Sequence, residues 1–118
     1  MSRTTPDNVT ELSPTEIKTL MDAGKVLLVD VREPAEYAAE RIPGALLYPL
    51  SSFDPAQLPP DNDRQLIFHC AAGGRSLTAA RARMTQGQPG AHMIGGITEW
   101  KAAGLPVIKL DPRTGRPL

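Results

Sequence analysis

The sequence predicts an α/β fold with a mainly parallel sheet and helices on both of its faces. Two apolar runs, Val26–Val31 and Gln65–His69, indicate buried strands, and segments with helical spacing of apolar residues alternate with them. A continuous β-branched run such as Val26–Val31 is typical of a parallel strand covered on both faces. Alternation of strands and helices favours right-handed crossovers, which build such a layered fold.

Length and charge limit the class of protein. The 118 residues suffice for one domain that buries about two thirds of its unfolded surface. The 13 basic and 13 acidic residues cancel, so no global field favours nucleic acid or an anionic membrane. The longest apolar run, Val26–Val29, is too short to span a bilayer, and the N-terminus lacks the apolar core of a signal peptide. We expect no nucleic-acid partner and no membrane contact.

Cysteine and histidine usage excludes further classes. Cys70 is the only cysteine, which excludes an intramolecular disulfide and indicates a reducing compartment, the cytoplasm. It also leaves Cys70 without a resolving partner, so any group it picks up must leave to a second molecule. His69 and His92 alone offer no metal-ligand spacing. We expect neither a metal nor a cofactor.

The chain opens with a polar segment, residues 1–8, that we expect to be flexible. Residues 9–12 predict a short first strand. Ser13-Pro14-Thr15-Glu16 is a capping box with proline at the first helical position, and Gly24 predicts the end of that helix.

The strand Val26–Val31 ends beside two charged residues, Asp30 and Arg32. Ligands of open α/β sheets bind at the carboxyl ends of such strands, where Cys70 also falls. Two interpretations stay open: the two side chains satisfy each other and the backbone, or Arg32 contacts an anion.

Short elements follow on either side of the central strand. Residues 34–39 predict a short helix, 46–48 a strand and 51–57 one helical turn. After the central helix, residues 91–94 predict a last strand, and Gly95-Gly96 turns into a helix that buries Trp100. Residues 109–118 are rich in breakers and predict a polar tail or linker.

Cys70 lies between the strand Gln65–His69 and a predicted helix over residues 76–84. The first turn of a helix presents unpaired N–H groups and the positive end of the peptide dipole. Gly73 and Gly74 can take positive φ and point N–H groups inward, and Arg75 adds a cation. An anion in such a loop is stabilised, so we expect a lowered pKa and a nucleophilic sulfur.

Three ordered motifs resemble those of the rhodanese-like sulfurtransferases, over roughly residues 10–108. The Cys70 loop has that family's form C-x-x-G-x-R. The other two motifs are Asp30-Val31-Arg32 with Glu36-Tyr37 and Ile42-Pro43-Gly44-Ala45, and Gly95-Gly96 with Trp100, Gly104 and Pro106-Val107. The resemblance implies a three-layer fold with a five-stranded, mainly parallel sheet flanked by helices, in a domain over residues 9–108.

The resemblance also implies sulfur transfer. The Cys70 thiolate would attack the outer sulfur of a small anionic donor such as thiosulfate and hold it as a persulfide. A thiophilic acceptor, cyanide or a thiol, would then remove that sulfur. Cys70 is the expected catalytic residue, Asp30 the expected support, and the expected substrate-binding residues are Ala71, Ala72, Gly73, Gly74, Arg75, Ser76 and Arg32.

Two other functions stay open. Cysteine phosphatases and arsenate reductases use a similar loop, and His69-Cys70 and Arg75-Ser76 fit their pattern. Their signature has five residues between cysteine and arginine, whereas this chain has four, and the smaller ring suits a sulfur atom better than a phosphate. The other function is a redox-sensing module without turnover, because an exposed thiolate of low pKa is easily oxidised.

Overall fold

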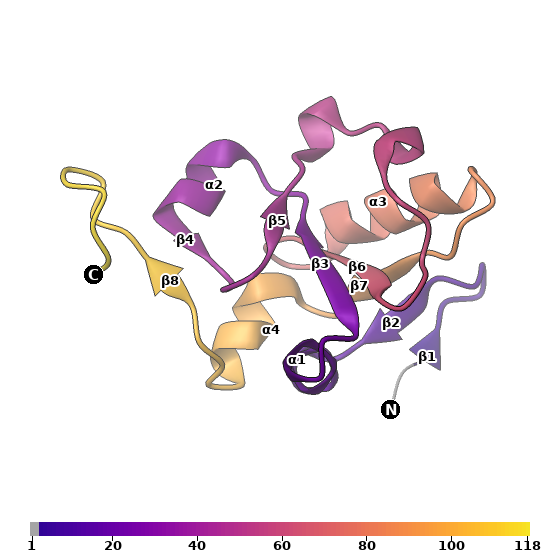
Figure 1. The fold of residues 1–118 in the computed structure, drawn as a ribbon, viewed down its shortest axis with the longest axis horizontal. Coiled ribbons are helices and arrows are strands. Elements are labelled where there is room, and N and C mark those ends of the chain that lie inside the picture. The colour runs from indigo at the N-terminus through magenta and orange to yellow at the C-terminus, as the bar shows by residue number, and fades with distance from the viewer. Residues whose placement is uncertain (1–2) are drawn as a thin grey trace.

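The computed structural model describes residues 3–118, which form a three-layer α/β domain (Figure 1). Over these residues the central sheet has six strands in the order β1-β2-β7-β6-β3-β5. In that order they are β1 (Arg3–Thr4), β2 (Thr10–Leu12), β7 (Ala91–Met93), β6 (Gln65–His69), β3 (Val26–Asp30) and β5 (Leu46–Leu47). Every neighbouring pair is parallel except β1 and β2, which confirms the predicted fold class.

The sixth strand lies where the sequence predicts a flexible segment. β1 pairs antiparallel with β2 after a reversal at Asn8, whose φ is 72°. Two-residue strands show no periodicity, so the sequence pattern gives no sign of β1. The count of five strands is therefore corrected to six, and residues 3–4 are ordered. Residues 1–2 of the predicted flexible segment lie outside the described residues.

Helices cover both faces of the sheet. α1 (Pro14–Asp22) and α4 (Gly96–Ala102) lie over one face, and α3 (Gly74–Met84) lies over the other. The first core cluster includes Ile17, Leu28, Ile67, Met93, Ile97 and Trp100. The second includes Val29, Leu66, Phe68, Cys70, Ala79 and Ala80. Successive strand residues alternate between the two clusters, as the pleat of a strand buried on both faces requires.

The local predictions are mostly confirmed. The capping box opens α1: Ser13 Oγ accepts the Glu16 N–H at 3.2 Å, and a Glu16 carboxylate oxygen accepts the Ser13 N–H at 3.0 Å. The turn expected over residues 51–57 consists of two 3₁₀ turns, η1 (Leu50–Ser52) and η2 (Pro55–Gln57).

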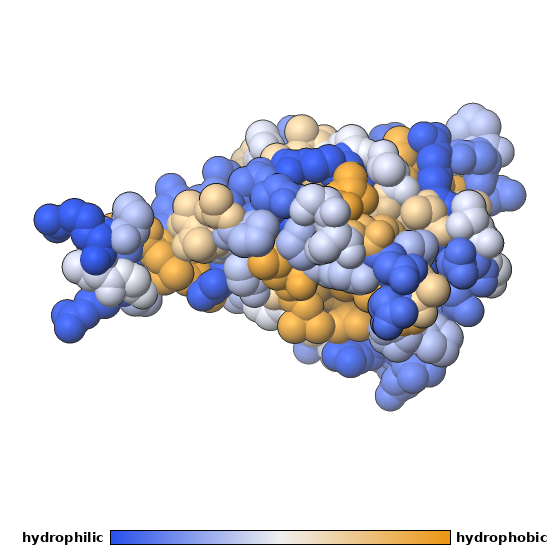
Figure 2. Space-filling model, turned by 90° about the horizontal axis from the view of Figure 1, so that it is seen from above, coloured by the Kyte–Doolittle hydropathy of each residue, from blue (hydrophilic) through white to orange (hydrophobic). Residues whose placement is uncertain are grey.

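A separate two-stranded sheet joins distant segments. β4 (Glu40–Arg41) follows α2 (Pro34–Ala39) and pairs antiparallel with β8 (Ile108–Lys109). The segment predicted as a tail thus begins in a strand, and it folds back through a bridge between Leu110 and Pro117. The molecule measures 43 × 30 × 25 Å, and this segment projects along its long axis (Figure 2). No helix within residues 3–118 has the length and apolar character needed to cross a membrane.

Candidate active site

Cys70 follows β6 at the carboxyl edge of the sheet. The register pairs His69 of β6 with Asp30 of β3, so the residues that follow these strands meet at one edge. The Cys70 side chain is 2% exposed and belongs to the core cluster beneath α3. The redox-sensing alternative assumed an exposed thiolate, whereas the first turn of α3 closes over the sulfur.

Backbone N–H groups converge on the sulfur. The N–H groups of Gly73 and Ser76 lie 3.1 and 3.4 Å from Cys70 Sγ, and Ser76 Oγ lies 3.6 Å from it. Burial opposes the thiolate and by itself raises the pKa of the Cys70 thiol. Hydrogen bonds from the side chain and backbone of Ser76, and from the N–H groups of Gly73 and Ala72, outweigh burial and lower this pKa below its ordinary value.

Only one of the two loop glycines has the expected conformation. Gly73 has a φ of 114°, which L side chains rarely adopt, and it turns the chain into α3. Gly74 is already the first residue of the helix, so α3 begins two residues earlier than predicted. A Cβ on Gly74 would meet no atom within 4 Å. The early start brings the N–H of Ser76 within reach of the sulfur.

The start of α4 (Gly96–Ala102) supports the Cys70 loop from outside. The N–H groups of Ile97 and Thr98, in the first turn of α4, donate to the carbonyl oxygens of Cys70 and Ala71 at 2.9 and 3.1 Å. Gly96 makes this approach possible, because a Cβ there would lie 2.3 Å from the Cys70 carbonyl oxygen. With its carbonyl groups held outward, the Cys70 loop presents N–H groups inward.

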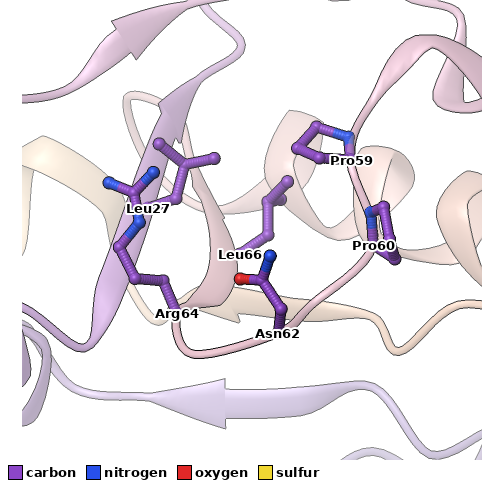
Figure 3. Close-up of a pocket in the computed structure, with 6 residues that line it drawn as sticks. All are labelled: Leu27, Pro59, Pro60, Asn62, Arg64 and Leu66. Atoms are coloured by element: carbon purple, nitrogen blue, oxygen red, sulfur yellow. The ribbon is translucent and has the colours of Figure 1, made fainter.

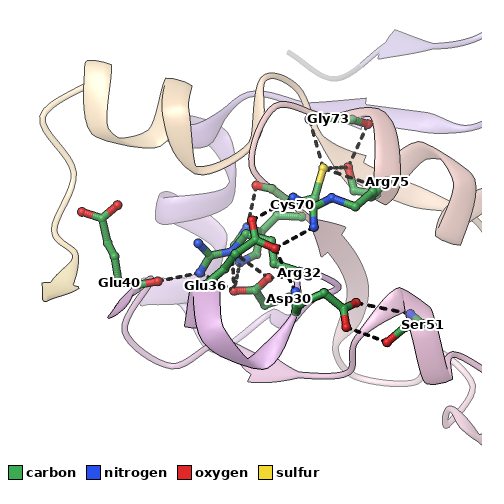
Figure 4. A network of polar contacts seen from close by, with 11 residues as sticks. Asp30, Arg32, Glu36, Glu40, Ser51, Cys70, Gly73 and Arg75 are labelled. Carbon is green, nitrogen blue, oxygen red and sulfur yellow. Dashed lines mark hydrogen bonds and ion pairs between the residues drawn. The ribbon is translucent and has the colours of Figure 1, made fainter. Parts of the chain in front are cut away.

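Arg75, the cation of the Cys70 loop, is bound to a carboxylate (Figure 4). Its two Nη groups donate to the two Glu36 carboxylate oxygens at 2.7 and 2.9 Å. The pair lowers the pKa of Glu36 to about 2, against burial, and raises the pKa of Arg75. The two residues lie 39 positions apart, so the sequence alone does not predict that they pair.

Asp30 and Arg32 bind each other, which agrees with the first of their two interpretations. Arg32 Nη2 lies 2.8 Å from an Asp30 carboxylate oxygen and 2.6 Å from the Glu40 carbonyl oxygen, and both side chains are buried. His69 Nε2 lies 3.4 Å from Asp30, and burial lowers the pKa of His69 despite that charge. This cluster holds the ends of β3 and β6 together beneath the loop.

Two further residues, His92 and Glu11, lie near the site, and the sequence did not single them out as site residues. Ser76 Oγ lies 2.8 Å from His92 Nδ1, and His92 Nε2 lies 3.0 Å from Glu11 Oε2. Glu11 and His92 stand opposite each other in the paired strands β2 and β7, and the sequence holds no signal of this pairing. Within residues 3–118, no three His, Cys, Asp or Glu side chains group as metal ligands.

A hollow elsewhere in the molecule takes no part in this site (Figure 3). It is lined by Leu27, Pro59, Pro60, Asn62, Arg64 and Leu66. Leu27 and Leu66 are the second residues of β3 and β6, whereas Cys70 comes after the last residue of β6. The hollow thus lies by the opposite ends of the strands, away from Cys70.

Comparison with known proteins decides the family. A model of the rhodanese-like domain matches residues 13–103. The chain belongs to the rhodanese-like family. The crystal structure of a rhodanese-related protein from Thermoplasma volcanium has a TM-score of 0.73 at 26% identity, covering 83% of this chain and 96% of that one. A Rhodopseudomonas palustris protein of unknown function, described as a possible tyrosine phosphatase, has a TM-score of 0.71 at 28% identity, covering 86% of both chains.

Relatives of this rhodanese-like chain include sulfurtransferases. A sulfurtransferase of Allochromatium vinosum is 38% identical over 90 residues, which are 75% of this chain and 84% of that protein. Human thiosulfate:glutathione sulfurtransferase is 33% identical over 100 residues, covering 72% of this chain and 87% of that protein. The uncharacterized protein slr1261 of Synechocystis is 38% identical over 110 residues, 92% of this chain, and the chain spans 61% of its length.

Proposed function

We propose that this rhodanese-like domain transfers a sulfane sulfur from a small anionic donor, such as thiosulfate, to cyanide or a thiol through a persulfide on Cys70. The observation that carries the proposal is the pair of N–H groups, from Gly73 and Ser76, at 3.1 and 3.4 Å from Cys70 Sγ. Fixed donors of this kind stabilise charge on a thiolate or a persulfide without having to reorganise.

The reaction has two steps. In the first, the Cys70 thiolate attacks the outer sulfur of thiosulfate, a bond forms between the two sulfurs, and sulfite leaves with the bonding electrons. In the second, cyanide or a thiolate attacks the outer sulfur of the persulfide, and the Cys70 thiolate leaves. Since no second cysteine exists in the chain, the sulfur must depart to another molecule.

The position of Cys70 favours a small transferred group. With the residue 2% exposed, the loop closes tightly around the sulfur, and we assign the anionic end of the donor to the rim. We assign Arg75 to that end of the donor. Because Arg75 already holds Glu36, the donor must displace a carboxylate to reach the guanidinium. Arg32 is held by Asp30, so we assign Arg32 and Asp30 to the support of the loop.

The relatives support the reaction class and the donor. One carries the name sulfurtransferase, and the human relative is named for thiosulfate and for a thiol, glutathione. The decisive experiment is the intact mass of the protein after incubation with thiosulfate. We expect the gain of one sulfur atom, its loss on addition of cyanide, and no gain in Cys70→Ser. A parent protein whose mass does not change would contradict the proposal.

The phosphatase alternative is weaker in this site. The guanidinium that would bind a phosphate faces Glu36, and four residues instead of five separate Cys70 from Arg75. The description of one structural neighbour as a possible tyrosine phosphatase gives this alternative a direct test. Were the protein to hydrolyse p-nitrophenyl phosphate faster than it forms thiocyanate, the phosphatase function would replace ours. A redox sensor without turnover would give an oxidised Cys70 but no thiocyanate.

A further inference from the structure

A chain of hydrogen bonds leads from Cys70 into the sheet. It runs from Cys70 Sγ to Ser76 Oγ at 3.6 Å, to His92 Nδ1 at 2.8 Å, and from His92 Nε2 to Glu11 Oε2 at 3.0 Å. We propose that Ser76, His92 and Glu11 form a proton relay that takes the proton of the Cys70 thiol. The inference rests on the proposed function, in which Cys70 reacts as a thiolate.

Rigid elements hold the members of this relay. Ser76 lies in the first turn of α3 and is fully buried. His92 of β7 is 4% exposed and stands directly opposite Glu11 of β2 in the parallel register, so the two side chains share one face of the sheet. The relay therefore needs no loop movement to form.

The far end of the relay decides which nitrogen of His92 carries a proton. Glu11 offers a carboxylate oxygen at 3.0 Å from Nε2, and a carboxylate can only accept a hydrogen bond, so Nε2 carries a hydrogen. In the neutral imidazole Nδ1 then has a free lone pair. The Ser76 hydroxyl at 2.8 Å must donate to it.

This assignment allows two hydrogen-bond arrangements that differ by one proton. In the first, the Cys70 S–H donates to Ser76 Oγ and the Ser76 O–H donates to His92 Nδ1. In the second, the thiol proton has passed to Ser76 Oγ and the hydroxyl proton to Nδ1. The new Nδ1–H then donates to Ser76 Oγ, and the Ser76 O–H donates to the thiolate. No electron is gained or lost, and Glu11 faces the imidazolium that has formed.

Charged groups flank both ends of the relay. Glu11 is the carboxylate at Nε2, and its other oxygen lies 3.6 Å from the Arg3 guanidinium of β1. On the sulfur side the cation is Arg75, which is bound to Glu36. The Gly73 carbonyl oxygen, 3.1 Å from Ser76 Oγ, is a competing acceptor for the one hydroxyl hydrogen, and His92 Nδ1 lies closer, at 2.8 Å. During transfer to the acceptor, the same hydroxyl stabilises the departing Cys70 sulfur.

The test is the rate of Cys70 alkylation by iodoacetamide against pH, followed by intact mass. The chain has one cysteine, so the readout belongs to Cys70 alone. His92→Asn can still bond Ser76 but cannot take up a proton. We expect its inflection to lie about one pH unit above the parent's, so that alkylation below both inflections is ~10-fold slower, the scale of one hydrogen bond to a charged group.

Two further variants separate the relay from a merely structural contact. Glu11→Gln keeps the shape and does not touch the sulfur, and we expect its inflection to rise by roughly half a pH unit. Asp22→Asn removes the same charge from an exposed pair with Lys18 on α1 and should leave the inflection unchanged. Thermal melts of all variants check the fold, and Glu11→Gln decides the question if His92→Asn does not fold.

The outcomes distinguish the relay from the proposed function. Unchanged inflections in His92→Asn and Glu11→Gln would overturn the relay, whether or not the parent forms a persulfide with thiosulfate. Raised inflections in a protein that never gains sulfur would support the relay and contradict the sulfurtransferase reaction.

Discussion

Two loops of the same construction have opposite roles in this molecule. After β6, Gly73 turns the chain into α3, and after β7, Gly95 turns it into α4, both in a left-handed conformation with φ of 114° and 73°. The start of α3 directs N–H groups at the Cys70 sulfur. The start of α4 directs two N–H groups at carbonyl oxygens of the Cys70 loop itself.

The difference teaches what the positive end of a helix contributes in each place. At α3 it surrounds the Cys70 sulfur, where the proposed reaction would place an anion. At α4 it fixes the backbone, because carbonyl groups held by Ile97 and Thr98 leave the N–H groups of the first loop facing inward. Neighbouring strands β6 and β7 bring the two helix starts together. One helix start faces the sulfur, and the other holds the loop that carries it.

Removing the sulfur tests the first loop most severely. Cys70→Ser should abolish thiocyanate formation from thiosulfate and cyanide, because a hydroxyl is a poor acceptor of sulfur at neutral pH. The change is nearly isosteric, so the thermal melt should stay close to that of the parent. Turnover near the parent's rate in the serine variant would contradict the assignment of Cys70 as nucleophile.

The second loop is tested at its point of closest approach. In Gly96→Ala, the new Cβ would lie 2.3 Å from the Cys70 carbonyl oxygen at a φ of 59°. We expect a loss of about 2–4 kcal/mol in the free energy of unfolding, from overpacking and backbone strain, and a fall in sulfur transfer. Chemical denaturation and the thiocyanate assay measure the two effects.

Gly74→Ala is the matched control in the first loop. Its Cβ would meet no atom within 4 Å, and the residue is helical. Alanine there should change the free energy of unfolding by less than about 1 kcal/mol, on the stabilising side. Equal losses in the two alanine variants would mean that the contact between the loops is not what Gly96 provides.

Variants of the Arg75–Glu36 ion pair separate effects on donor binding from effects on the chemistry of the sulfur. Glu36→Gln keeps the hydrogen bond from the Glu33 N–H but removes the charge that competes for Arg75. We expect KM for thiosulfate to fall about two- to fivefold, the scale of a partly exposed ion pair. Arg75→Lys should raise KM, because an ammonium cannot form two parallel bonds. Steady-state kinetics that leave both values at the parent's would exclude Arg75 from donor binding.

The smallest expected effect is on the pH dependence of the protein's stability, and it comes from His69, which is buried beneath the Cys70 loop. Burial lowers the pKa of His69 from its ordinary value of 6.5, so below that pH the unfolded chain binds a proton that the native protein does not. Stability should therefore be full above pH 6.5 and fall as the pH decreases, by at most about 1.4 kcal/mol per pH unit from this group. Urea denaturation at several pH values measures the slope. His69→Asn should flatten it, and an unchanged slope would show that His69 does not cause it.

Much of the site could be predicted from the sequence because it is local. The strand that ends at His69, the turn at Gly73 and the helix behind it occupy consecutive positions, so the N–H groups that surround Cys70 follow from residues at most six positions away. The capping box of α1 is local in the same way, with its two hydrogen bonds joining Ser13 and Glu16. Apolar periodicity likewise predicts the buried strands β3 and β6 without knowledge of their neighbours.

What the tertiary structure alone decided are contacts between distant positions. Glu36 reaches Arg75 across 39 residues, His92 reaches Ser76 across 16, and Glu11 reaches His92 across 81. Their encounter depends on the order and register of the strands, which place β2, β7, β6 and β3 side by side. Two-residue strands such as β1 and β8 also form only when a partner strand is already present, since they bury too little surface to order themselves. The surroundings of the Cys70 sulfur were thus determined by its own short segment, and its more distant partners by the assembly of the sheet.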